Sequence, residues 1–202
     1  LMNNKLTLFN SGLRVVGFDP SLRNWGIASG MYYPNEDGRL SIELLEVTQP
    51  VLPKGKQVRQ NSLDLLAAAA LAKAAFDSII TADAVFVEVP VGSQSSRAMA
   101  SYGICVGVLG AIRSGGSPFF ELSPEEVKKA SVGIKTATKA QMIEWAVAKH
   151  PEANWPTHKK NGSTHVTESS AEHMADAVAT IYAGLSCQPF QQMLALIKRS
   201  AT

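Results

Sequence analysis

The sequence predicts an α/β protein built on a mixed five-stranded sheet that is flanked by helices. Two observations predict this fold class. Three strand-like segments come first, joined by connections short enough for antiparallel pairing, and two further strand-like segments then alternate with long helical ones. A helix between two strands implies a crossover connection, which joins parallel strands. The sheet should therefore be antiparallel where the chain begins and parallel where it continues.

The first three strands form the antiparallel part of this plan. Residues 13–18 are an apolar run, which is typical of a central strand buried on both faces. Residues 25–30 follow after a short polar connection and should pair with the first strand. Residues 40–47 alternate partly between apolar and polar side chains and form the third strand, after the turn-forming sequence PNEDG at 34–38.

The middle of the chain alternates helix and strand. Residues 58–80 predict a helix, AVFVEV at 84–89 the next strand, and 95–113 a second long helix with many small side chains. Small residues allow another helix to approach closely, either within the fold or across a dimer interface, and the sequence leaves both open. Helical spacing in the first helix is set by Leu63, Leu66, Ala70, Ala74 and Ile80.

The last strand is predicted at residues 118–122, and Ser123 then caps a helix, with Glu126 completing a capping box. This order of meandering strands followed by alternating helices and strands is the ribonuclease H-like arrangement, although other mixed α/β folds begin the same way. The remaining predicted segments are a loop at 133–138, a helix at 139–149, an irregular stretch at 151–166, a helix from Ser169 or Ser170 to Leu185, and an amphipathic segment at 191–198.

Length and composition indicate one domain at residues 13–202 behind a flexible N-terminal arm at 1–12. The chain has 202 residues, 46% of them hydrophobic, and a formal net charge of only +2, which does not by itself indicate a nucleic-acid binder. No signal-peptide pattern or membrane-length apolar run is present, so we expect a cytoplasmic protein, in the host cytoplasm if it is viral. Cys105 and Cys187 are expected to be buried free thiols.

Acidic residues fall where neighbouring elements should meet. Asp19 ends the first strand and Glu88 lies in the fourth, so parallel pairing brings both to one edge of the sheet. His173 and Asp176 are spaced i, i+3 on one helix face, which Glu172 can share. Each has an ordinary alternative: Asp19 as a turn former, Glu88 in a salt bridge, and the helical pair facing solvent.

The combination is more informative than its members. Oxygen and imidazole ligands without a cysteine favour Mg²⁺ or Mn²⁺ over a structural zinc ion. Two such ions held by shared carboxylates activate water and stabilise a leaving phosphate-ester oxygen. The sequence thus points to phosphodiester cleavage.

Basic residues support a phosphate substrate. Lysines and threonines around a loop and a helix start can grip backbone phosphates, although a solvated helix face is the plainer alternative. A weaker patch combines Lys159 and Lys160 with His158 and His165, where zinc binding is not favoured because no cysteine lies nearby. The main candidates for DNA contact are Lys128, Lys129, Lys135, Thr136 and Lys139.

Four blocks resemble the motifs of RuvC-type Holliday junction resolvases. They are GFDPSLRNWGIA at 17–28, VFVEVPVGSQSSRAMASYGICVGVLGAI at 85–112, ELSPEEVKKASVGIKTATKAQMIEWAV at 121–147 and AEHMADAVATIYAG at 171–184. The blocks occur in the family's order, so the resemblance covers most of the chain from 13 to 185. Some relatives carry aspartate where the last block has histidine.

The resemblance implies a homodimeric, Mg²⁺-dependent endonuclease that nicks two strands of a four-way DNA junction symmetrically, with two ions per active site and Mn²⁺ as a substitute. The helix at 95–113 would supply much of the dimer interface, and the basic residues would contact the DNA backbone, with Lys129 or Lys135 near enough to stabilise transition-state charge. No membrane partner is expected. The implied catalytic and metal-binding residues are Asp19, which would bridge the two ions, Glu88, His173 and Asp176.

Two departures from the family pattern bear on substrate range. Where relatives often carry an aromatic wedge after the strand glutamate, this chain has Val89, Pro90 and Val91. The stretch at 151–166 is longer than usual and suits an added DNA-contacting loop. Such divergence is typical of viral or mobile-element relatives, which act on other branched DNA too. Two alternatives are a ribonuclease H-like enzyme acting on RNA or an RNA–DNA hybrid, and a non-catalytic DNA-binding module.

Overall fold

The computed structural model describes residues 12–55 and 59–199, so the predicted arm lies outside the described residues except for Gly12. Within this part of the chain a five-stranded sheet has the order β3-β2-β1-β4-β5. The pairs β1–β2 and β2–β3 are antiparallel, and β1–β4 and β4–β5 are parallel, which confirms the predicted mixed sheet. The strands are β1 (Leu13–Asp19), β2 (Trp25–Tyr33), β3 (Arg39–Thr48), β4 (Ala84–Glu88) and β5 (Phe119–Leu122).

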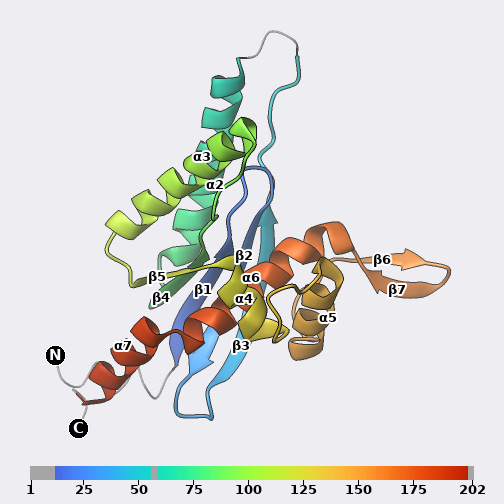
Figure 1. Ribbon diagram of the computed structural model, residues 1–202. Helices are drawn as coiled ribbons and strands as arrows, with labels where there is room; N and C mark the ends of the chain where they lie inside the picture. Colours follow the sequence, from blue (N-terminus) through green and yellow to red (C-terminus); the bar gives the residue numbers. More distant parts are fainter. Residues whose placement is uncertain (1–11, 56–58, 200–202) are drawn as a thin grey trace.

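Helices cover both faces of the sheet (Figure 1). Alternate residues of β1 explain the two layers, because Val15 packs into one core cluster while Val16 and Phe18 pack into the other. One face carries α2 (Gln60–Ile79) and α3 (Ser96–Ser114). The other carries α4 (Pro124–Ser131), α5 (Lys139–Lys149) and α6 (Glu168–Ser186), with α7 (Gln188–Arg199) continuing from α6.

Helix α6 lies unusually close to the sheet. A Cβ atom built on Gly17 of β1 would come within 3.0 Å of the Ala177 carbonyl oxygen, and one built on Gly184 of α6 would overlap the ring of Phe86. Only hydrogen fits at these positions, so the glycines fix how near the helix comes to β1 and β4. As a result α6 is buried along most of its length, and it forms the centre of one core cluster.

The face of α2 that packs on the sheet differs from the face that sequence spacing predicted. Leu66 is 50% exposed and Ile80 is 78% exposed. The helix has apolar residues around most of its circumference, so spacing alone does not identify the face that packs on the sheet. The side chains that are buried are Asp64, Ala67, Leu71, Ala75 and Ile79.

The prediction that residues 151–166 are irregular is wrong for most of the segment. A hairpin of β6 (Thr157–Lys160) and β7 (Ser163–Val166) projects away from the sheet (Figure 1). Its two-residue turn has positive φ at Asn161 (52°) and Gly162 (80°). Asn-Gly is the residue pair that such turns favour, and this local signal outweighs the weak strand propensity around it.

Residues 151–156, before the hairpin, are fastened to the body of the protein. The Asn154 side chain accepts a hydrogen bond from the Leu45 N–H and donates one to the Leu45 carbonyl, both at 2.8 Å. His150 is only 3% exposed and lies 3.0 Å from the Tyr182 hydroxyl of α6. These contacts attach the end of α5 to both β3 and α6.

Capping boxes begin both helices that flank the loop at 133–138, α4 and α5. Ser123 and Glu126 form the expected capping box, and Thr138 and Gln141 form a second one at the start of α5. Cys105 and Cys187 are free thiols, and only Cys105 is fully buried. Among the described residues, no helix has the length and apolar character needed to cross a membrane.

Burial lowers the pKa of His150, against the opposing effect of Glu152. The unfolded chain, with a His pKa of 6.5, therefore binds this proton more readily, so the free energy of unfolding should fall as the pH drops below 6.5. We expect His150→Gln to flatten the pH dependence of stability, measured by urea unfolding at several pH values. The exposed His158→Gln variant should keep the wild-type slope, and an unchanged slope in His150→Gln would contradict this assignment.

Candidate active site

The central strands β1 and β4 deliver two carboxylates to one edge of the sheet. Their parallel register pairs Phe18 with Val87, so the next residues along the two strands are Asp19 and Glu88. Phe18 and Val87 face the α2–α3 layer, and side chains alternate along a strand. Asp19 and Glu88 therefore both face the α6 layer, and they lie at one edge of the sheet, where parallel pairing was expected to bring them.

Gly26 brings α6 to the same edge. It is the register partner of Asp19 on β2. A Cβ atom at Gly26 would overlap the backbone carbonyl of His173. The helix backbone thus lies directly on the strand at this point, and the His173 side chain comes next to Asp19. No sequence pattern indicates this role, because Gly26 is typical of the ordinary start of a strand.

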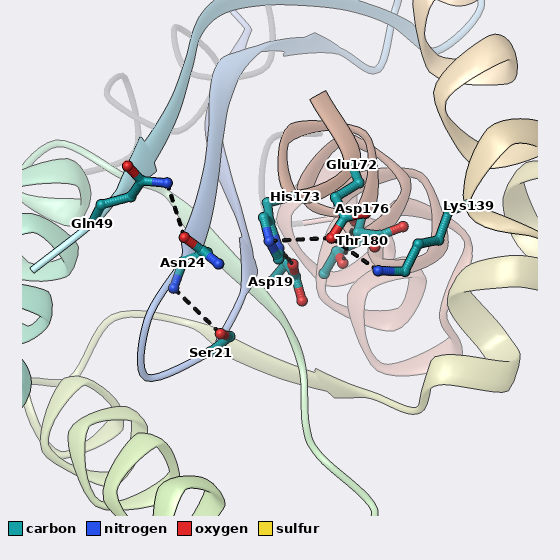
Figure 2. A network of polar contacts seen from close by, with 9 residues as sticks. All are labelled: Asp19, Ser21, Asn24, Gln49, Lys139, Glu172, His173, Asp176 and Thr180. Carbon is teal, nitrogen blue, oxygen red and sulfur yellow. Dashed lines mark hydrogen bonds and ion pairs between the residues drawn. The ribbon is translucent and has the colours of Figure 1, made fainter. Parts of the chain in front are cut away.

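His173 lies between two carboxylates (Figure 2). Its Nδ1 is 2.8 Å from Asp19 Oδ2, and its Nε2 is 3.4 Å from Glu172 Oε1. The hydrogen bond with Asp19 raises the pKa of His173, and burial opposes that rise. Side-chain exposure is 15% for His173 and 17% for Asp19, so water screens this pair only partly.

The other two predicted carboxylates belong to the same electrostatic cluster. Burial and then the charges of Asp19 and Asp176 raise the pKa of Glu88 to about 8, and Lys128 opposes the rise. The pKa of Asp176 is also raised, first by burial and then by Asp19, with His173 and Lys128 opposing. The structure therefore brings together all four residues predicted from the sequence, and they carry more negative charge than their surroundings offset.

This cluster has the chemistry of a site for hard divalent cations. Three carboxylates and one imidazole match the ligands that Mg²⁺ or Mn²⁺ accepts, and a cation would oppose the burial and the neighbouring charges that raise the pKa of Glu88. In residues 12–55 and 59–199, however, no group of three or more His, Cys, Asp or Glu side chains has the arrangement of a metal site. The Asp19–His173 hydrogen bond joins two of the candidate ligands to each other.

The predicted DNA-contacting residues separate into two groups. Lys139 contacts Glu172 at 3.0 Å, and Lys128 is near enough to Glu88 and Asp176 to affect their pKa values. These two lysines thus lie beside the carboxylate cluster.

The other predicted DNA-contacting residues have different surroundings. Lys135 pairs with Glu125 at 3.6 Å and is largely exposed. Lys129 lines a small hollow with Leu122 and Cys187, and Thr136 is exposed. The expectation that Lys129 or Lys135 stabilises transition-state charge stays a prediction.

The connection between β1 and β2 is held by a small polar network that sequence reasoning missed. The Asn24 N–H donates to Ser21 Oγ at 3.3 Å, and Gln49 Nε2 donates to Asn24 Oδ1 at 2.9 Å (Figure 2). These bonds tie the loop that follows Asp19 to the residue after β3. They hold the β1–β2 loop beside Asp19.

No model of a known protein family and no curated protein sequence matches the chain. Solved structures do resemble it. RuvC of Thermus thermophilus in complex with a Holliday junction substrate matches with a TM-score of 0.61 and 17% identity, over 91% of this chain and 96% of that one. The chain has the fold of RuvC-type resolvases.

Two further structures carry the same likeness. Another Thermus thermophilus RuvC structure has a TM-score of 0.59 and 17% identity, over 90% of this chain and 96% of that one. The yeast mitochondrial Holliday junction resolvase Ydc2 has a TM-score of 0.56 and 17% identity, over 99% and 87%. The predicted ribonuclease H-like fold is thereby confirmed. At this identity the likeness to RuvC concerns the fold, so the chemistry has to be argued from this chain's side chains.

The contact at Gly26 predicts a sharp response to one methyl group. Gly26→Ala should lower the free energy of unfolding by about 1–3 kcal/mol, because the new Cβ must push the His173 backbone away. Denaturant unfolding measures the change. Ser29→Ala, three residues further along β2, is the control and should change stability by less than about 0.5 kcal/mol. Equal stability of the two variants would mean that α6 does not rest on β2 at Gly26.

Proposed function

We propose that this protein is a metal-dependent, structure-selective DNA endonuclease that resolves four-way junctions by paired nicks. The observation that supports this proposal most is the joining of Asp19 on β1 to His173 on α6, at the edge where β4 ends in Glu88. That cluster lies on a fold shared with junction resolvases.

In this proposal the ligands for divalent ions are Asp19, Glu88, His173 and Asp176, with Asp19 in the bridging position. Bound Mg²⁺ or Mn²⁺ would lower the pKa of a water molecule and offset charge on the phosphate oxygens. His173 contributes an imidazole where some relatives carry aspartate, which makes the site less negative and less repulsive to phosphate. Its hydrogen bond to Asp19 orients the ring.

Lys128 and Lys139 are the residues that we propose hold the scissile phosphate. Each lies beside the carboxylate cluster from a different helix, α4 for Lys128 and α5 for Lys139. Lys139 is 77% exposed and can leave Glu172 to meet a phosphate oxygen. Lys129, Lys135 and Thr136 are proposed to contact the backbone farther from the cut.

A nuclease acting on RNA or on an RNA–DNA hybrid is the second candidate, because the same fold class and carboxylate chemistry serve that reaction. The lysine-bearing α4–α5 segment favours the junction nuclease, since it adds a basic surface beside the carboxylates. A non-catalytic DNA-binding module is less favoured, because all four acidic and imidazole candidates are kept together at one edge.

We expect the wild-type protein with Mg²⁺ to nick a synthetic four-way junction in two opposed strands, and to cut linear duplex, a flap and an RNA–DNA hybrid less efficiently. Asp19→Asn should reduce nicking by at least about 10³-fold while junction binding persists, because it removes the proposed bridging ligand. Gel analysis of end-labelled strands measures the cuts. Omission of the divalent ion should have the same effect as the substitution.

Asp37→Asn is the matched control for that experiment. Asp37 lies in the β2–β3 turn with a φ of 53°, a conformation that asparagine also tolerates, so this variant should nick like wild type. Cleavage of the hybrid alone would reject junction resolution in favour of the second candidate. Full activity in Asp19→Asn would remove Asp19 from the mechanism.

We also propose that the protein is a homodimer, as paired nicks require. Helix α3 exposes Met99 and Val106 at 46% and 45%. Cβ atoms at Gly103 and Gly107 would meet nothing within 4 Å among the described residues, so these two glycines of α3 do not pack closely against the described part of the chain. A hollow of about 370 Å³ between α2 and α3, with Leu65 at its rim, offers space for a second copy.

Sedimentation of the full chain at micromolar concentration should give a dimer. Val106→Glu should shift it toward monomer, because the change places a carboxylate in the proposed apolar interface. Leu196→Glu introduces the same charge at a residue of α7 that is 62% exposed and should leave the dimer intact. A wild-type protein that sediments as a monomer would reject the dimer.

A further inference from the structure

The β6–β7 hairpin is not explained by packing. All eight of its strand residues are exposed except Val166, which is partly buried. A two-stranded hairpin without an apolar face is only marginally stable alone, so its retention suggests a partner. Its segment from Thr157 to Thr167 contains two lysines, two histidines, several hydroxyl groups and no carboxylate. This composition is complementary to an anion.

The hairpin has two faces of different character. The register pairs Lys160 with Ser163 next to the turn, and His158 with His165 two positions away. Pairs that are two positions apart lie on the same face of a hairpin. The two imidazole rings lie side by side with a centroid distance of 6.0 Å and planes tilted by 33°. The opposite face has Lys159, paired with Thr164.

A groove of about 720 Å³ runs along the first face. The side chain of Lys159, on the other face, does not contribute to it. Glu168, in the first turn of α6, is the one acidic residue among the lining residues that the structure describes, and its charge opposes an anionic ligand. The lining is formed by Ile143, His158, Lys160, Asn161, Ser163, His165, Val166, Thr167 and Glu168.

The groove and the candidate active site lie on the same side of the α5–α6 pair. Ile143 of the groove is four residues after Lys139 on α5, and Glu168 is four residues before Glu172 on α6. Residues four apart share a helix face. Lys139 and Glu172 contact each other beside His173, so the two faces form one continuous surface that leads from the hairpin to the carboxylates.

The length of α6 sets the smallest distance between the base of the hairpin and the carboxylates. Glu168 and Asp176 are eight residues apart, or about 12 Å at the helical rise. A DNA strand advances about 3.4 Å per nucleotide along its axis, so this distance corresponds to roughly three or four nucleotides. Lys160 lies next to the hairpin turn, beyond Glu168, so a backbone cut at the carboxylates would reach Lys160 at that separation or a larger one (Figure 1).

We propose that the Lys160 face of the β6–β7 hairpin binds the sugar–phosphate backbone of DNA at least about three nucleotides from the phosphate that is cut. This inference rests on the proposed function and adds to it a second point of contact with the substrate. Lys160 supplies the charge, and His158, His165 and Ser163 supply hydrogen-bonding groups to phosphate oxygens. This contact involves no base edge, so it extends the binding surface along a junction arm without adding sequence preference.

The two adjacent lysines provide a matched test, because each substitution removes one charge from neighbouring positions on opposite faces. Binding to a fluorescent four-way junction is measured by anisotropy without divalent ions, over a series of salt concentrations. Lys160→Ala should weaken binding roughly three- to tenfold and lower the slope of log affinity against log salt by about one. Lys159→Ala should change affinity by less than about twofold and keep the slope.

A second variant, which should strengthen binding instead of weakening it, tests the same groove. Glu168→Gln removes the carboxylate from the lining and should tighten junction binding. Position along the DNA is tested by placing single uncharged methylphosphonate linkages about one to ten nucleotides from the mapped nick. The linkage that weakens wild-type binding most should lie about three or more nucleotides from the nick. It should add no further loss in Lys160→Ala, because the interaction between Lys160 and that phosphate is then already lost.

The outcomes separate this inference from the proposed function. If wild type binds and nicks the junction while Lys160→Ala and Lys159→Ala lose affinity equally, or neither loses any, the hairpin contact is rejected and the nuclease stands. If wild type neither binds nor nicks any branched DNA, the proposed function fails, and this inference fails with it. Preferential loss in Lys160→Ala together with the mapped linkage effect supports the contact.

Discussion

The arrangement of the site depends on one close contact, that of the α6 backbone with β1 and β2. At Gly17 and Gly26 the strands carry no Cβ, so the helix lies on the sheet with no side chain between them. Asp19, the register partner of Gly26, then reaches the His173 ring at 2.8 Å. Larger residues at either glycine would separate the helix from the sheet and place the imidazole beyond hydrogen-bonding reach. The Asp19–His173 contact thus depends on the lack of side chains at Gly17 and Gly26.

The two faces of the sheet differ in how deeply their helices are buried. On one face α6 is nearly surrounded, and its polar residues Glu172, His173 and Asp176 are collected where β1 and β4 end. On the other face α2 and α3 leave apolar side chains in solvent, among them Leu65 and Val106. The proposed junction nuclease would use both properties, a polar edge for the substrate and an apolar surface for a second copy.

The order of strands and helices could be predicted because apolar runs, capping boxes and turn residues are local signals. Asp19 and Glu88 could be assigned to one edge because parallel strands share their ends. The face of α2 could not be predicted, since Leu66 and Ile80 are as apolar as the buried residues. Gly26 carries no signal in the sequence, because its role depends on a helix more than a hundred residues away. Lys128 could not be separated from Lys129 without the direction in which α4 packs. The Asn-Gly turn of the hairpin was visible in the sequence and outweighs the composition around it.

Asn154 has a consequence for the protein outside its active site. β3 forms one edge of the sheet, and an edge strand presents unpaired N–H and carbonyl groups that can recruit a strand from another molecule. The Asn154 amide occupies both groups of Leu45 with a pair of hydrogen bonds that imitates a neighbouring strand. Asn154 lies between α5 and the hairpin. Its side chain therefore interrupts the exposed edge of β3, which is the longer of the two edge strands of the described sheet. It hinders strand-to-strand association at Leu45, so this edge is less open to other molecules than the surfaces proposed for dimerisation and for DNA.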